Sequence, residues 1–408
     1  MRRISIIYCV LLLFVSKAHC STVFMQITKN LQEKAEIVLL LGTEQDNYWD
    51  KFLSTLKRDL GYSGYFFVED ARFVEDPEVF KAKYITPITL QGIKTSQGIK
   101  VVLEDNLDEK ILFEKHYSPG SNPSYFAHTV NDEIVFQLTG RQGIARSRIL
   151  FVSNSTGKYE LYAVDYDGEN LKQITSTDYM VHYPRWLSYP QEILYISYEG
   201  GWPKLVKMNL KNGEKRTLLS EPGLNACASP SIDTGEIAVV LSKSGRPDVY
   251  VIDFDGKIKR QITSSNSTDA SPTFSPDGAT IAFVSDRYGS PQIYTTTKDG
   301  HRLKRISFIS GYATSPAYSP DGNYIAYVFQ KGGYGVAIYE VSTEETRIVG
   351  EGLGSEDISW ASDSRHIIYT DIRSKASSLV ILNIITGEKR ILKTGKTNSF
   401  TPSWSKDK

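Results

Sequence analysis

The sequence predicts an all-β six-bladed propeller preceded by a small α/β domain. A tetrapeptide that ends in a large apolar residue recurs through the C-terminal part of the chain, and a turn glycine recurs with a similar period. Each repeat holds four short β-type segments within about 40–45 residues, which is the size of one propeller blade. We therefore divide the chain into a signal peptide (1–20), an N-terminal α/β domain (21–142) and a propeller (143–408).

The first twenty residues have the features of a secretory signal peptide. The chain starts with a basic Met1-Arg2-Arg3, continues through an apolar run over 4–15 and has small residues at Ala18 and Cys20. This apolar run is too short to span a bilayer, and the small residues suit cleavage before Ser21. An uncleaved membrane anchor is the alternative. We expect the mature chain to be exported.

Composition argues against several classes of function. Cleavage before Ser21 would leave Cys227 as the single cysteine, so neither an internal disulfide nor a cysteine pair for zinc is expected. Lys plus Arg and Asp plus Glu both total 47, which is unlike the basic surface of a nucleic-acid binder. No later segment is apolar enough to cross a membrane. No cofactor and no metal ion are expected.

The region before the propeller alternates between strand-like and helical patterns. Apolar residues at helical spacing predict a helix over 46–60. Asn122 and Pro123 provide a cap and a first-turn proline for a second helix, which should stop at Gly140. Strand-like segments are expected at 37–41, 66–68, 100–103 and 110–113. This alternation predicts a small α/β domain.

The repeat is clearest at Ser271-Pro272-Thr273-Phe274, where a Ser-Pro-Asp-Gly turn and the strand 280–285 follow. Proline presets such a turn and glycine accepts its positive φ. The pattern returns at 315–318, and weaker copies are placed at 183–186, 229–232, 357–360 and 401–404. The closing residues are spaced by 46, 42, 44, 42 and 44 positions and are Trp186, Ile232, Phe274, Tyr318, Trp360 and Trp404. In the clearest copy, strands are expected at 272–274, 280–285, 292–296 and 303–307.

The two ends of the repeat region complete each other. Residues 148–175 supply three β-type segments but lack the tetrapeptide strand, whereas residues 400–405 supply that strand alone. Pairing them makes a sixth blade and leaves no open sheet edge.

Motifs for catalysis are missing from the sequence. It contains no nucleophile elbow, phosphate loop, dinucleotide-binding glycine pattern, Cys-x-x-Cys pair or His-Glu-x-x-His. We interpret His128 as a packing or hydrogen-bonded residue, and the acidic stretches 165–168 and 253–256 as ordinary Asp-Gly turns. Asp286-Arg287 suggests a blade-to-blade ion pair. The chain is therefore predicted not to be an enzyme.

Three local motifs resemble the TolB family of the bacterial Tol–Pal system. The family's helix exit is similar to 59–66 (DLGYSGYF), and its helix leading into the propeller is similar to 127–140 (AHTVNDEIVFQLTG). Its most recognisable pair of blade strands is similar to 285–294 (SDRYGSPQIY). A Ser-Pro-Asp-Gly repeat alone is shared by many propellers, so the motifs at the domain boundary make this resemblance specific.

The resemblance implies a periplasmic protein, monomeric within a multi-protein complex, that supports outer-membrane integrity and envelope constriction at division. It implies binding of the peptidoglycan-associated lipoprotein Pal by residues before the tetrapeptide strands: Ala226, Cys227, Ala228, Ser229, Asp269, Ala270 and Ser271, with Thr314 and Ser315 added by blade equivalence. It also implies contact with the inner-membrane protein TolA through Ser21, Thr22, Val23, Phe24, Met25, Gln26, Ile27 and Thr28.

Two other classes of function stay open. The propeller of a prolyl-oligopeptidase-type hydrolase uses similar blades, but that enzyme also needs a hydrolase domain with a nucleophile elbow. A sugar- or metal-binding propeller lectin or lyase needs ionisable groups that converge on the central channel with perturbed pKa values.

Overall fold

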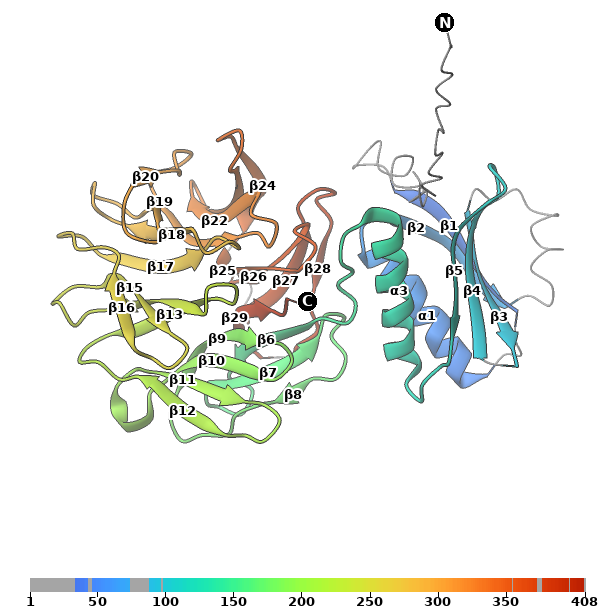
Figure 1. The fold of residues 1–408 in the computed structure, drawn as a ribbon, viewed down its shortest axis with the longest axis horizontal. Helices are drawn as coiled ribbons and strands as arrows, with labels where there is room; N and C mark the ends of the chain where they lie inside the picture. The colour runs from blue at the N-terminus through green and yellow to red at the C-terminus, as the bar shows by residue number, and fades with distance from the viewer. Residues whose placement is uncertain are drawn as a thin grey trace, which may run out of the picture.

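The computed structural model describes residues 34–42, 46–73, 88–96, 98–353, 355–372, 376–395 and 397–406. In this part of the chain a five-stranded sheet with two α-helices precedes six four-stranded sheets arranged as a ring (Figure 1). The predicted fold class, a six-bladed propeller behind a small α/β domain, is confirmed. The predicted signal peptide (1–20) lies outside the described residues. The predicted boundary between 142 and 143 falls in the connection before the first propeller strand and stays a prediction.

The sheet of the N-terminal domain has the order β2-β1-β3-β4-β5. Its strands are β1 (Ala35–Gly42), β2 (Phe66–Phe73), β3 (Ile88–Thr95), β4 (Gly98–Asp105) and β5 (Lys110–Tyr117). β1 runs parallel to β2 and β3, and the remaining pairs are antiparallel. Strand β3 is not anticipated by the sequence analysis, because its segment ITLQGIKT has a glycine and polar residues among its apolar ones.

Helix α3 begins and ends where its capping residues predict, whereas α1 begins one residue and ends two residues later than the predicted range 46–60. Asp46 accepts hydrogen bonds from the first N–H groups of α1 (Asn47–Tyr62), and Asn122 caps α3 (Pro123–Thr139) by accepting from the backbone of Tyr125. Gly140 ends α3 with a φ of 68°, which suits glycine. The helices pack against each other through stacked Phe52 and Phe126, whose ring centroids are 4.7 Å apart, and share one apolar core with the sheet.

Each propeller blade consists of four antiparallel strands numbered here from the channel outward. The first strands are β9 (Val181–Ser188), β13 (Asn225–Ser231), β17 (Asp269–Phe274), β21 (Ala313–Tyr318), β25 (Ser355–Trp360) and β29 (Ser399–Trp404). The second strands are β6 (Arg148–Ser153), β10 (Glu192–Ser197), β14 (Glu236–Leu241), β18 (Thr280–Ser285), β22 (Tyr324–Gln330) and β26 (His366–Asp371). These second strands are almost completely buried, which explains their short continuous apolar runs.

The third strands are as long as the second strands, and most of the fourth strands are shorter and more exposed. The third strands are β7 (Glu160–Asp165), β11 (Lys204–Asn209), β15 (Asp248–Asp253), β19 (Gln292–Thr297), β23 (Tyr334–Glu340) and β27 (Ser378–Asn383). The fourth strands are β8 (Lys172–Gln173), β12 (Lys215–Leu219), β16 (Ile258–Gln261), β20 (Lys304–Arg305), β24 (Thr346–Leu353) and β28 (Lys389–Ile391). None of the helices in the described residues is long and apolar enough to span a bilayer.

The predicted ring closure is confirmed. Strand β29 pairs antiparallel with β6, with Ser399 opposite Ser153 and Trp404 opposite Ile149. The indole N–H of Trp404 donates to the Ser147 hydroxyl at 2.6 Å, so the last strand is also held by a side chain. The blade that contains both ends of the ring therefore leaves no unpaired strand edge between them.

The structure corrects the predicted register of one repeat. On β13 the residue opposite Ala238 is Ser229, just as Thr273 on β17 is opposite Ala282, so the repeat unit is Cys227-Ala228-Ser229-Pro230 rather than 229–232. With this register, the closing residues from Trp186 to Trp404 are spaced by 44, 44, 44, 42 and 44 positions. The sequence pattern is misleading here because the Ser-Pro pair of this segment, Ser229-Pro230, lies two residues after the start of the unit, whereas Ser271-Pro272 begins its unit.

Candidate functional site

The propeller has two faces, and the N-terminal domain contacts one of them. Turns between first and second strands and between third and fourth strands lie on one face, because neighbouring strands are antiparallel. The contacts with the N-terminal domain all involve this face, through the turn after β7, Arg365 before β26 and Arg390 on β28. We call the opposite face, formed by the loops between second and third strands and between blades, the distal face.

One residue per blade adopts a left-handed backbone conformation where the first strand starts at the distal face. The six residues have φ values from 47° to 52° and are Tyr183, Cys227, Ser271, Ser315, Asp357 and Thr401. In each blade the pairing of the first and second strands shifts register at this point. Such a conformation costs a non-glycine residue about 1–2 kcal/mol. Strain of this kind clusters at ligand-binding surfaces, so the ring of bulges marks the channel mouth as a candidate site.

A polar cavity of about 260 Å³ opens at this mouth of the channel. It brings together five of the residues predicted for the Pal-binding face: Cys227, Ala228, Ser271, Thr314 and Ser315. The sequence analysis missed the seven other lining residues, which include Tyr183, Arg185 and Asp357. The positions of these three residues within the repeat units 183–186 and 357–360 are the signal that could have identified them.

The remaining predicted residues lie beside this cavity or below the surface. Ala226 and Ala270 are half-buried and occupy equivalent positions next to the bulges. Ser229 accepts a hydrogen bond from the backbone N–H of Phe274 at 3.2 Å and so joins two blades. The predicted TolA segment, 21–28, lies outside the described residues.

Asp269 is fully buried and pairs with Arg287 of its own blade, whose Nη2 lies 3.1 Å from each carboxylate oxygen. Asp286 accepts from the backbone N–H of Thr268. The expected blade-to-blade pair of Asp286 and Arg287 is therefore wrong, because Arg287 turns back onto its own first strand. Both contacts stiffen the loops of the distal face.

Burial shifts the pKa values of two side chains at or next to the channel mouth. Burial and the nearby Arg185 guanidinium together lower the pKa of His182 to about 4. Burial raises the pKa of the Cys227 thiol. In the described part of the chain no group of three or more His, Cys, Asp or Glu residues is placed to hold a metal ion. The mouth therefore combines the guanidinium of Arg185 and the carboxyl group of Asp357 with a buried thiol, which suits a polar partner surface.

Exposed aromatic residues surround this mouth on the distal face. Trp202, between β10 and β11, is 69% exposed; Tyr288, between β18 and β19, is 79% exposed; and Phe308, after β20, is 71% exposed. Large exposed aromatic side chains are enriched where proteins bind other proteins.

The opposite mouth of the channel is wider and more apolar. Its cavity of about 480 Å³ is lined by the closing residues of the repeat units, including Trp186, Trp360 and Trp404. Their indole N–H groups donate to Ser403 O, Ala317 O and Ser147 Oγ. The bonds of Trp186 and Trp360 therefore join adjacent blades, and the bond of Trp404 lies within the closing blade.

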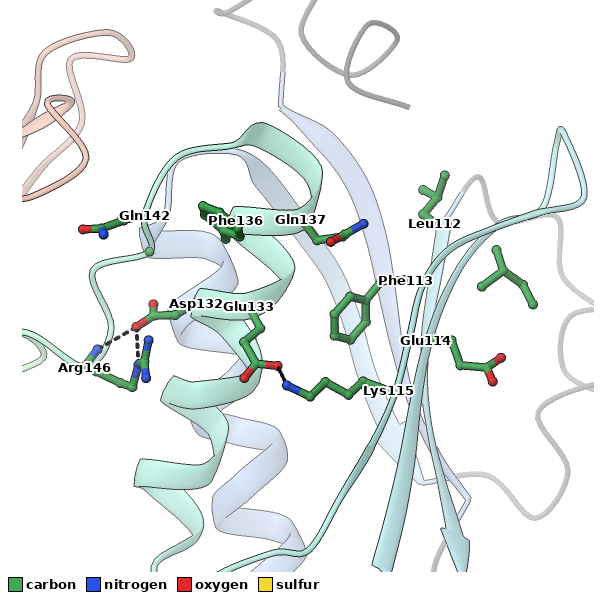
Figure 2. Close-up of a pocket in the computed structure, with 12 residues that line it drawn as sticks. Leu112, Phe113, Glu114, Lys115, Asp132, Glu133, Phe136, Gln137, Gln142 and Arg146 are labelled. Carbon is green, nitrogen blue, oxygen red and sulfur yellow. Dashed lines mark hydrogen bonds and ion pairs between the residues drawn. The ribbon is translucent and has the colours of Figure 1, made fainter. Parts of the chain in front are cut away.

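A groove of about 590 Å³ lies in the N-terminal domain between β5 and α3 (Figure 2). Phe113 and Phe136 line it, and its charged groups are paired within the domain. Lys115 lies 2.6 Å from Glu133, and Arg146 lies 3.1 Å from Asp132. The twelve lining residues include no histidine and no cysteine.

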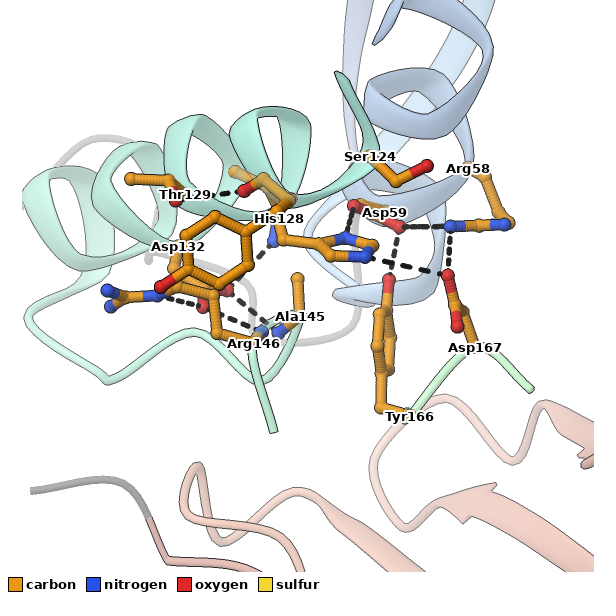
Figure 3. Close-up of polar contacts among 12 residues, drawn as sticks. Arg58, Asp59, Ser124, His128, Thr129, Asp132, Ala145, Arg146, Tyr166 and Asp167 are labelled. Carbon is orange, nitrogen blue, oxygen red and sulfur yellow. Dashed lines mark hydrogen bonds and ion pairs between the residues drawn. The ribbon is translucent and has the colours of Figure 1, made fainter. Parts of the chain in front are cut away.

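A network of charged and polar side chains joins the two domains (Figure 3). Asp59 at the end of α1 accepts from the Tyr166 hydroxyl of the propeller at 2.5 Å and lies 2.6 Å from Nδ1 of His128 on α3. Arg58 contacts both Asp59 and Asp167. The hydrogen-bonded interpretation of His128 is confirmed, and two of the family-like motifs, 59–66 and 127–140, converge at this contact.

A second part of the domain contact is sterically tight. The Arg365 guanidinium lies 4.1 Å from the centre of the Tyr65 ring. Gly64 packs so closely on Asn383 that a Cβ atom there would lie 2.2 Å from the Asn383 side-chain nitrogen. The domains therefore fit each other at specific residues.

These features define a two-domain β-propeller protein with one strained, polar channel mouth and an α/β domain fixed to the opposite face. The family described as the TolB beta propeller domain matches residues 135–408. Since this match covers more than half of the sequence, the chain belongs to the TolB family.

Individual relatives agree with this assignment. The Tol-Pal system protein TolB of Desulfosudis oleivorans is 36% identical over 121 residues, which cover 29% of this chain and 27% of the relative. The TolB homolog of Chlamydia muridarum is 27% identical over 256 residues, which cover 60% of this chain and 57% of the relative. The matched segments thus span about a quarter to just over half of these relatives. The crystal structure of TolB from Acinetobacter baumannii superimposes with a TM-score of 0.80 at 25% identity, over 92% of this chain and 97% of that one.

Proposed function

We propose that this chain is a periplasmic, non-catalytic subunit of a Tol–Pal complex that binds Pal through the distal face of its propeller. The ring of six left-handed bulges around the polar cavity is the observation that carries this proposal. It sets a rigid, strained surface at the face that the N-terminal domain leaves uncovered, and exposed aromatic side chains surround it. Support of outer-membrane integrity and constriction at division would follow from this binding.

Binding of the mature chain, from Ser21 onward, to the periplasmic domain of a cognate Pal tests the proposal. Ala270→Arg and Ser271→Arg would each place a long charged side chain beside the cavity, and we expect either to weaken binding at least tenfold. Ser342→Arg is the matched control, because Ser342 is exposed in a turn of the opposite face. Absence of binding at high micromolar concentration, or an equal loss of Pal affinity in the control variant, would contradict the Pal assignment.

We further propose that residues 21–28 bind TolA once the signal peptide has been removed. The support is the family membership and the position of these residues directly after the predicted cleavage site. A chain lacking 21–28 should lose TolA binding and keep Pal binding, as measured with both purified domains. Retained TolA binding would contradict this part of the proposal and leave the Pal assignment untouched.

A further inference from the structure

The contact between the two domains is centred on a buried histidine of α3. Nδ1 of His128 lies 2.6 Å from Oδ2 of Asp59, and its Nε2 lies 3.6 Å from Oδ2 of Asp167 in the propeller turn after β7 (Figure 3). The side chains of all three residues are at most 5% exposed. One imidazole ring therefore has a carboxylate of a different domain at each nitrogen.

The proton on His128 decides whether both contacts are attractive. An ionised carboxylate only accepts hydrogen bonds, so Nδ1 must carry the hydrogen that it shares with Asp59. In the neutral ring, the lone pair of Nε2 would then face the negative oxygen of Asp167. In the protonated ring, both nitrogens carry hydrogens and the imidazolium attracts both carboxylates.

The charged groups around His128 come from three elements. From α1, Arg58 contacts Asp59 and Asp167. From the propeller turn, the Tyr166 hydroxyl donates to Asp59, and Glu169 pairs with Lys51 at 2.7 Å and with Arg58 at 3.5 Å. From β28, Arg390 stacks on the Tyr166 ring.

These groups act on the pKa of His128 in opposite directions. Burial lowers this pKa and Arg58 lowers it too, but the hydrogen bond to Asp59 and the charges of Asp59 and Asp167 outweigh both. The pKa of His128 is therefore held above its usual value of 6.5. Stabilisation from the proton is present below that value and is lost as the pH rises through the raised pKa.

A second buried histidine at the same contact has the opposite arrangement. Nδ1 of His366 lies 2.6 Å from Asp363, but its Nε2 lies 3.1 Å from the side-chain nitrogen of Asn383. The Asn383 oxygen accepts from the backbone N–H groups of Ile385 and Thr386, which fixes its amide nitrogen toward the ring. Nε2 of His366 thus faces an amide nitrogen, whereas Nε2 of His128 faces a carboxylate oxygen.

We propose that His128 is a proton-operated clamp between the two domains. Its imidazolium joins Asp59 of the N-terminal domain to Asp167 of the propeller, and loss of the proton turns the Nε2 lone pair toward Asp167 and loosens the contact. The clamp goes beyond partner binding, because it makes the rigidity of the domain arrangement depend on pH.

Hydrogen exchange of the mature chain, measured between pH 6 and 9 and corrected for the intrinsic exchange rate, tests the clamp. Above the pKa of His128, the protection factors of the backbone amides in the turn 166–169 should fall by up to tenfold per pH unit. This slope is expected because the intact contact binds one proton more than the opened contact. NMR of the imidazole should show His128 losing its proton over the same range. A His128 that stays protonated to pH 9, or that deprotonates with unchanged protection, would overturn the proposal.

Two variants and one control separate the clamp from a general effect of pH. His128→Asn keeps an amide toward Asp59 but carries no titrating group, so protection of 166–169 should become independent of pH. Asp167→Asn offers the neutral ring an amide partner and should also remove the dependence, which keeps the test valid if His128→Asn fails to fold. His116→Asn changes an exposed histidine on β5 and should leave the dependence unchanged. Unchanged pH dependence in either of the first two variants would contradict the proposal.

Discussion

Single residues at the domain contact are constrained by the space around them. Gly61 and Gly64 lie three positions apart at the end of α1, but only Gly64 has a positive φ, of 75°, and a close neighbour in the propeller. A Cβ atom at Gly61 would meet nothing within 4 Å. Glycine is therefore required at position 64 by the backbone and by the space around it, whereas neither requires it at position 61.

Gly64→Ala is expected to lower the free energy of unfolding by more than about 1 kcal/mol. The left-handed backbone alone costs about that much for alanine, and the new Cβ would press on Asn383. Gly61→Ala, inside the helix, should stabilise by up to about 1 kcal/mol. Urea unfolding of both variants measures the difference. An unchanged free energy of unfolding in Gly64→Ala would show that the domain contact accommodates the added Cβ atom at this point.

His182 is expected to make stability depend on pH in the acid range. Because burial lowers its pKa to about 4 in the folded state, the unfolded chain binds the proton first as the pH falls below 6.5. Stability should therefore decrease from pH 6.5 to about 4 through this residue, and His182→Gln should flatten that part of the curve. Denaturant unfolding at a series of pH values checks the slope. An unchanged slope in His182→Gln would assign it to other groups.

At the scale of elements, the propeller depends on the pairing of β29 with β6. Trp404 at the end of β29 is 2% exposed and bonds to Ser147 at the start of the ring. The backbone N–H groups of Trp404 and Trp186 donate to the hydroxyls of Ser359 and Ser403, so the first strands β29 and β9 are each bonded to the blade before them. Closure of the ring is thus supported by side chains as well as by backbone pairing.

Trp404→Ala is expected to destabilise the protein by about 3–5 kcal/mol, because it removes a large buried ring and leaves a cavity at the closing blade. Trp202→Ala should change stability by less than about 0.5 kcal/mol, because Trp202 is 69% exposed. The free energy of unfolding in urea compares the two. Equal effects would mean that Trp202 is buried in solution, for example by self-association.

At the scale of the whole molecule, the two domains are expected to unfold together. Asp59 is 1% exposed and satisfies both His128 and Tyr166, so it couples the two cores through one carboxylate. Removal of one partner from a buried ion pair costs about 3–5 kcal/mol, because the other partner is left buried and unpaired.

Asp59→Ala should therefore divide one thermal transition into two, with the N-terminal domain unfolding first. Asp108→Ala, in an exposed turn of the same domain, is the control and should keep a single transition. Calorimetry of the mature chain measures the number of transitions. A single transition in Asp59→Ala would show that the domains are coupled mainly through other contacts, such as Arg365 with Tyr65.

The sequence by itself determined the repeat architecture and the caps of α3. Each of these features depends on local chemistry: apolar runs for the buried second strands, Ser-Pro-Asp-Gly for the turns, and Asn122 and Gly140 for the ends of α3. Ring closure was also predictable, because the missing strand of the first unit and the extra strand at the end complete each other.

Only the tertiary structure decided the register at Cys227, the ring of left-handed bulges and the domain contact. The register depends on pairing with β14, and the position of Ser229-Pro230 in the sequence suggests a register two residues away from the observed one. Positive φ at non-glycine residues has no local sequence signal when it is imposed by neighbouring strands. Asp59, His128 and Asp167 come from segments far apart in the chain, and their charges interact because folding buries them within a few ångströms of one another.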